Sequence, residues 1–286
     1  MAIKMQPIDE NSGKWSFSNS HVPHIDQTGR EVKFAFPPRR IVSLVPSQTE
    51  LLFDLGLSEQ IIGVTKFCIH PLNNKPRIGG TKKLHLDQIR QLQPDLIIAN
   101  KEENEQEQVF RLMKDFPVWV TDVHDLDTAL EMIAQVSAIT DRAEKGLQIC
   151  AAIKTAFEQL PFAVLQKKAL QTVIPPKVAY FIWKDPWMVA GGDTFISAML
   201  EKCGFGNVFK NRTRYPVISL EELKDTGCQL VLLSSEPFPF KETHFSFFKD
   251  HPVQLVDGEM FSWYGSRILR AAAYFREIFY QNQAFF

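Results

Sequence analysis

The stretch LDQIRQLQPDLIIANKE (86–102) recurs, with an offset of about 135 residues, as LEELKDTGCQLVLLSSE (220–236). Each copy contains a short helix pattern with an acidic start, a few turn-forming residues, an apolar run and a final glutamate. A continuous apolar run of this length is typical of a parallel strand that is buried on both faces. The repeat therefore predicts two similar α/β halves.

The flanking segments repeat in the same order. PRRIVSLVPS (38–47) corresponds to PPKVAYFIWK (175–184), and FPVWVTDV (116–123) corresponds to HPVQLVDG (251–258). Each of these segments reads as an apolar strand that follows a proline. Strands that alternate with helices form a parallel sheet with helices on both faces, and the ligand crevice lies outside the carboxyl ends of the strands. We therefore expect the functional residues in the loops that follow the strands.

Capping residues predict where helices begin and end in both halves. Ser47 and Glu50 have the S-x-x-E spacing of a capping box, and Gly56 can end that helix in a left-handed conformation. In the second half, Asp193 is predicted to cap the helix TFISAMLEKC (194–203). Both halves thus begin with a strand, a loop and a helix.

The segment between the halves has apolar residues at helical spacing. We predict an α/β protein of two Rossmann-like lobes with parallel sheets, joined by a single long linking helix. The expected boundaries are an N-terminal lobe over 1–139 with an extension over 1–37, the linking helix over 140–168 and a C-terminal lobe over 169–286. A helical linker is stiffer than a glycine-rich one, so we expect a small closing motion and a largely preformed cleft.

Composition narrows the class of partner and leaves the compartment open. The net charge is −1, which gives no long-range field toward nucleic acid or an anionic membrane and favours a small-molecule partner. A secretory signal needs an apolar run of about 7–15 residues. The first twenty residues contain no such run. The chain as it stands is therefore not expected to be exported, and a cytoplasmic protein is as simple an interpretation as a processed one.

One pair of residues suggests a metal. Cys68 and His70 are two positions apart, so in an extended loop their side chains can point the same way. With Glu102, Glu103 or His124 nearby, they could bind zinc or a transition metal, or supply an axial ligand to a bound chelate. The alternative, which we favour, is a buried cysteine that packs as a small apolar group and a histidine bonded to backbone.

The motifs of common enzyme classes are absent from the sequence. There is no G-x-S-x-G, H-E-x-x-H or Walker A motif, and GFGNVF (204–209) lacks the third glycine of a dinucleotide-binding loop. Cys68 with His70 or His124 is the one candidate nucleophile and base, a pair that is recognised by geometry rather than by sequence. We predict that the protein is not an enzyme.

Several segments together resemble the helical-backbone metal receptors, the class III substrate-binding proteins of ABC transporters, which include cobalamin and ferric-siderophore receptors. The resemblance covers nearly the whole chain. It rests on GREVKFAFPPRRIVSLVPSQTELLFDLGL (29–57), GGTKKLHLDQIRQLQPDLIIANKEEN (79–104), GGDTFISAMLEKCGFGNVF (191–209) and SWYGSRI (262–268). It implies a rigid two-lobed fold, a metal chelate held between the lobes as transported ligand, and docking onto a permease dimer.

The loops after the strands supply the candidate ligand contacts. These are Phe67, Cys68, His70, Lys101, Glu102, Trp183, Trp187, Phe261, Trp263, Tyr264 and Arg267. Aromatic side chains suit a large flat chelate, and an arginine can donate to a carboxylate, phosphate or amide at its rim. By the resemblance, Phe67, Trp183 and Arg267 match positions where cobalamin receptors contact their ligand. Two aromatic positions of that pattern are Thr81 and Asn100 here.

The resemblance also implies a partner and a compartment. Asp87 and Glu221 match the acidic residues that pair with arginines of an ABC permease dimer, although Asp87 is shorter than the glutamate of the cobalamin receptors. A carboxylate in the first turn of a helix also stabilises the helix dipole, which is an alternative role for both. The resemblance implies a monomer in the periplasm that has no intrinsic cofactor and carries an iron complex or cobalamin.

Three alternatives remain open at this stage. The protein can be a cytoplasmic store for a metal chelate, a chelatase-like enzyme that acts on a tetrapyrrole, or a binder of free metal ions through Cys68 and His70. An importer receptor binds its ligand without changing it. An enzyme turns its ligand over, and a store needs no membrane partner.

Overall fold

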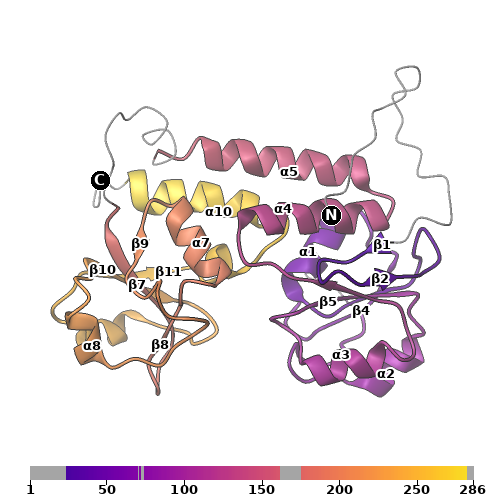
Figure 1. Cartoon of the computed structure of the whole chain (residues 1–286), viewed down its shortest axis with the longest axis horizontal. Coiled ribbons are helices and arrows are strands. Elements are labelled where there is room, and N and C mark those ends of the chain that lie inside the picture. Colours follow the sequence, from indigo (N-terminus) through magenta and orange to yellow (C-terminus); the bar gives the residue numbers. More distant parts are fainter. Residues whose placement is uncertain (1–23, 70, 72–73, 162–174, 282–286) are drawn as a thin grey trace.

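A computed structural model of the chain describes residues 24–69, 71, 74–161 and 175–281. It contains two α/β lobes with parallel sheets, which confirms the predicted fold class (Figure 1). Residues 1–23 of the predicted extension and 162–168 of the predicted linking helix lie outside the described residues. Among the described residues, no helix is both long and apolar enough to cross a membrane.

The N-terminal lobe is built on four parallel strands in the order β4-β3-β5-β6. The strands are β3 (Ile41–Ser43), β4 (Ile61–Val64), β5 (Leu96–Asn100) and β6 (Val118–Thr121), and the helices are α1 (Pro46–Asp54), α2 (Leu86–Leu92), α3 (Gln106–Leu112) and α4 (Leu126–Ile139). A short antiparallel pair, β1 (His24–Ile25) and β2 (Glu31–Val32), precedes them. Every residue of β3, β5 and β6 is buried, as their continuous apolar runs predict.

The C-terminal lobe repeats this plan with one antiparallel edge strand. Its strands are β7 (Lys177–Trp183), β8 (Met188–Val189), β9 (Gly206–Asn207), β10 (Leu230–Ser234) and β11 (Val253–Val256). The order is β11-β10-β7-β8, where β8 runs antiparallel to β7, and β9 also pairs with β7. The helices are α7 (Phe195–Lys202), α8 (Leu220–Lys224), α9 (Glu259–Ser262), α10 (Ile268–Phe275), η1 (Glu242–Phe247) and η2 (Arg276–Gln281). The repeated segments of the sequence thus form β3 and β7, β5 and β10, and β6 and β11.

Both predicted N-terminal helix caps are wrong, whereas Gly56 follows the end of α1 in the predicted left-handed conformation, with φ +83°. Helix α1 begins with Pro46 at its first position after Val45, which makes no side-chain cap, and Ser47 and Glu50 are buried within the helix. Proline is favoured there because its missing N–H has no partner in the first turn anyway. In the second half the cap of α7 is Thr194, whose hydroxyl accepts from the amide of Ser197 at 3.2 Å.

Helix α5 (Ala143–Glu158) joins the lobes and lies within the predicted range 140–168. It packs on α4 of the N-terminal lobe and on α10 of the C-terminal lobe, along the edge at the top of Figure 1. A Cβ at Gly146 would lie 1.9 Å from Ser137 Oγ, so the glycine allows α5 to approach α4 closely. Buried residues of both lobes and of α5 form one continuous apolar cluster, which makes this side of the molecule a shared core.

Candidate functional site

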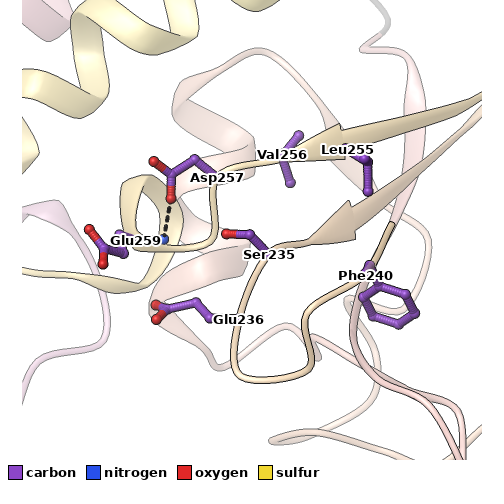
Figure 2. Close-up of a pocket in the computed structure, with 7 residues that line it drawn as sticks. All are labelled: Ser235, Glu236, Phe240, Leu255, Val256, Asp257 and Glu259. Atoms are coloured by element: carbon purple, nitrogen blue, oxygen red, sulfur yellow. Dashed lines mark hydrogen bonds between the residues drawn. The ribbon is translucent and has the colours of Figure 1, made fainter. Parts of the chain in front are cut away.

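A pocket of about 610 Å³ lies at the carboxyl ends of β10 and β11 (Figure 2). It is lined by Ser235, Glu236, Phe240, Leu255, Val256, Asp257 and Glu259. Glu236 accepts hydrogen bonds from Ser262 Oγ at 2.8 Å and from Trp263 Nε1 at 3.1 Å, and burial raises the pKa of its carboxyl. The C-terminal lobe therefore presents an acidic wall where its strands end.

A second pocket, of about 590 Å³, lies beyond the carboxyl end of β4. It is lined by Lys66, Phe67, Arg77, Gly79, Gly80, Thr81, Lys82, Lys83 and His85. Gly79 has φ +98°, and a Cβ there would lie 2.4 Å from Lys83 O, so only glycine fits this turn. The N-terminal lobe thus presents a basic wall around the ring of Phe67.

The two lobes touch between these pockets. The hydroxyl of Tyr215, in the C-terminal lobe, donates to Glu102 Oε1 of the N-terminal lobe at 2.7 Å. The guanidinium of Arg214 lies 3.0 Å from the same oxygen. Buried Asn104 holds the Glu102 loop in place, because its amide donates to the carbonyls of Leu44 and Thr81 at 3.1 Å each. Side-chain contacts therefore join the two lobes at this point.

Glu103 lies among charges from both walls. Burial raises the pKa of its carboxyl to about 7, and the charges of Glu102 and Glu236 add to the rise while Lys82 opposes it. Glu236 lines the acidic pocket and Lys82 the basic one, so charged groups of both pockets lie close enough to Glu103 to act on its carboxyl. The carboxyl of Glu103 is thus half ionised near neutral pH.

The raised pKa predicts a pH-dependent stability. The folded state holds the Glu103 proton up to about pH 7, whereas the unfolded state releases it near the ordinary pKa of 4.5. The free energy of unfolding therefore decreases as the pH rises from about 4.5 to about 7. We expect Glu103→Gln to be more stable than the wild type at pH 8 by up to about 3 kcal/mol, and nearly equal to it at pH 4.5. Urea unfolding at several pH values measures the difference. A constant difference across this range would contradict the assignment.

Arg267 lies in a buried ion-pair cluster rather than at an open wall. Its Nε and Nη2 bond both oxygens of Glu50 at 2.7 and 3.0 Å, and its Nη1 lies 2.7 Å from Glu259 Oε2. The guanidinium also stacks on the ring of Trp263, 4.7 Å from the centroid. Since Glu50 is on α1 and Glu259 on α9, the cluster connects the two lobes.

The predicted aromatic contacts divide into exposed and buried groups. Phe67, in the loop after β4, is 49% exposed, and Trp183, the last residue of β7 in the other lobe, is 39% exposed. Trp187 is half-buried and packs against Phe240 and other phenylalanines. Phe261, Trp263 and Tyr264 are buried, and Phe261 packs on Tyr180 and Phe275 within the core. Phe67 and Trp183 are therefore the two predicted aromatics with substantial surface to offer a ligand.

The remaining predicted contacts lie at the rim or in the core. Lys101 is exposed and forms an ion pair with Asp122 at 2.6 Å. Cys68 is fully buried, and its sulfur lies 3.2 Å from the hydroxyls of Thr49 and Thr65. Burial raises the pKa of this thiol, and His70 lies outside the described residues. No group of three metal-binding side chains occurs in the part of the chain that the structure describes.

Asp87 and Glu221 lie in the first turns of α2 and α8. Both side chains are exposed, and Asp87 also pairs with Arg90 at 3.0 Å. In Figure 1, α2 and α8 lie on the edge of the molecule opposite α5, one on each lobe. The two carboxylates thus belong to helices that lie on the same side of the protein.

Several cleft residues had no sequence signal that pointed to them. Arg214 and Tyr215 lie in the loop between β9 and α8, outside any motif, and Asn104 reads as a loop asparagine. Phe238 and Phe240, which pack beside Trp183 and Trp187, come from the run EPFPFKETHFSFF (236–248). The density of phenylalanine in that loop was a signal for an aromatic cluster.

Comparisons with known proteins agree with this architecture. The sequence profile described as "Periplasmic binding protein" matches residues 41–254. A vitamin B12-binding protein of Pectobacterium atrosepticum is 26% identical over 242 residues, which cover 82% of this chain and 86% of the relative.

Two solved structures show the same fold. The periplasmic vitamin B12 binding protein BtuF of Vibrio cholerae has a TM-score of 0.72 and 20% identity, and the match covers 84% of this chain and 95% of that one. The periplasmic heme-binding protein RhuT from Roseiflexus sp. RS-1 has a TM-score of 0.71 and 21% identity, with coverage of 85% and 98%. Because the family profile spans well over half of the chain, the protein belongs to the periplasmic binding protein family of non-enzymatic, ABC-transporter substrate-binding proteins.

Proposed function

We propose that this protein captures a metal chelate in the cleft between its lobes and delivers it to an ABC importer. The chelate is a ferric siderophore, cobalamin or a related corrinoid or tetrapyrrole. The observation that carries the proposal is the pair of pockets at the carboxyl ends of strands in the two lobes, together with exposed Phe67 on one lobe and exposed Trp183 at the end of β7 on the other. Relatives that are named for binding vitamin B12 and heme support this ligand class.

The ligand contacts follow from exposure and position. Phe67 and Trp183 stack against the chelate from opposite lobes, and Glu102 and Lys101 lie at the rim. Trp187, Phe261, Trp263 and Tyr264 form the support behind this surface, and Arg267 fixes the lobes to each other. The protein works outside the cytoplasm, as its periplasmic relatives do. Of the eleven contacts predicted from the sequence, Phe67, Trp183, Glu102 and Lys101 therefore remain as proposed ligand contacts.

The aromatic contact is tested by Trp183→Ala. Loss of a stacking ring is expected to weaken chelate binding about tenfold, because buried aromatic anchors dominate such interfaces. The measurement is an absorbance titration with the chelate that raises the melting temperature of the wild type. Phe110→Ala is the matched control, since Phe110 is an exposed ring on α3. Wild-type affinity in the Trp183 variant would place the ligand elsewhere.

A further inference from the structure

The basic pocket of the N-terminal lobe combines an apolar floor with a ring of cations. The ring of Phe67 lies over Gly80, where an added Cβ would be 3.1 Å from its Cε2 atom. Lys66 Nζ lies 4.9 Å from the centroid of the same ring. Lys82 and Lys83 complete the rim and are exposed. An apolar surface edged by ammonium groups suits a flat ligand that carries an acidic group at its edge.

The charge of the three lysines in this pocket is largely uncompensated. Across the described ranges, Lys66, Lys82 and Lys83 form no ion pair with a carboxylate, although Lys82 lies within the field of Glu103. Lys82 Nζ donates to the carbonyl of Glu102, which leaves two of its three N–H groups for another acceptor. Arg77 uses its Nη1 on the carbonyls of Thr65 and Cys68 and so holds the loop that carries Lys66.

The opposite wall of the cleft has the reverse sign. Glu236, Asp257 and Glu259 line the pocket of the C-terminal lobe (Figure 2), and because Glu259 is paired with Arg267, Glu236 and Asp257 supply its negative charge. An acidic group on a ligand is attracted by the first wall and repelled by the second. Specificity from an attractive and a repulsive element together is stronger than from either alone. The cleft therefore distinguishes the two ends of a ligand by charge.

We propose that the pocket beside Phe67 is an anion subsite, which takes a carboxylate or phosphate of the bound chelate through Lys66, Lys82 and Lys83 and so fixes its orientation in the cleft. This inference rests on the proposed function, because it assigns a part of the same chelate site. The amide-rich or cationic side of the chelate then faces Glu236 and its neighbours.

The subsite is tested with Lys66→Ala/Lys83→Ala and two pairs of chelates. Lys82 is kept because it also bonds Glu102. One pair is cobalamin and cobinamide, which lacks the nucleotide phosphate, and the other is haem and its dimethyl ester, which lacks free carboxylates. For the pair that binds, we expect the double substitution to weaken the affinity for the anionic chelate about tenfold and to leave the affinity for the other chelate unchanged. An effect in the cobalamin pair would identify the bound group as a phosphate, and an effect in the haem pair would identify it as a carboxylate. The control is Lys145→Ala/Lys154→Ala, two exposed lysines on α5.

Equal weakening of both members, or of neither, would overturn the subsite. If the wild type binds none of the four chelates, the anion subsite is tested separately by titration with inorganic pyrophosphate. Backbone amide shifts at Gly79 and Gly80 that vanish in the double variant would uphold the anion site even if the proposed function failed. Absence of these shifts in the wild type would overturn it.

Discussion

Replacement of Arg267 by methionine is expected to lower the free energy of unfolding by about 3–5 kcal/mol. The guanidinium is buried and bonds the carboxylates of Glu50 and Glu259, so its removal takes the cation that bonds both from two largely desolvated carboxylates. The loss also removes the contact between α1 and α9, which ties one lobe to the other. Urea unfolding at neutral pH measures the effect.

Two further variants make this prediction specific. Arg270→Met is the matched control, because Arg270 is on the same helix but is 64% exposed and lies 3.5 Å from Glu50, and we expect it to change stability by less than about 1 kcal/mol. Glu50→Gln combined with Arg267→Met is expected to be less destabilised than the sum of the single changes. A stable Arg267 variant with lost chelate affinity would instead make this arginine a direct ligand contact.

Reversal of the two tip charges is expected to abolish uptake of the chelate while leaving its binding intact. We propose that Asp87 and Glu221 dock onto arginines of the permease, since both are exposed and lie on the same edge of the molecule. In Asp87→Lys/Glu221→Lys, like charges meet at both contacts, and uptake is expected to fall more than tenfold. The chelate dissociation constant is expected to stay within about twofold because both residues lie outside the cleft pockets.

A matched reversal separates docking from helix electrostatics. Asp127 and Glu144 are exposed acidic residues in the first turns of α4 and α5, away from α2 and α8. Asp127→Lys/Glu144→Lys changes the net charge and the helix dipoles in the same way. Uptake in reconstituted vesicles is expected to remain near the wild-type rate with this control. An equal loss in both double variants would assign Asp87 and Glu221 to helix stability alone.

The fold was predictable because it depends on local patterns. Buried parallel strands need continuous apolar runs, and the repeat of these runs in the sequence predicts the two lobes without any knowledge of contacts. The helix caps were less predictable. Glu50 has the spacing of a capping residue, but its partner Arg267 is 217 positions away, and a sequence pattern does not report such a contact. The same limit applies to Tyr215 and Glu102.

For the other candidate site residues, burial determines which side chains can contact a ligand. Cys68, Phe261 and Phe67 all lie near strand ends, so all three were predicted as ligand contacts. In the structure the first two are fully buried and Phe67 is half-exposed. Which side chain of a loop turns into the core depends on packing against distant elements, as for Cys68 against Thr49 of α1. The sequence therefore predicts which loops carry the site residues, but not which of these side chains are exposed to a ligand.

The central claim is that the inter-lobe cleft binds a metal chelate, and a thermal-shift and absorbance titration tests it most directly. Purified protein is titrated with cobalamin, haem, ferric siderophores, and free iron and zinc. A ligand that binds only the folded state raises the melting temperature by mass action. We expect a rise with one class of chelate, reduced in Trp183→Ala, and none with free metal. A rise with free metal alone would contradict the account.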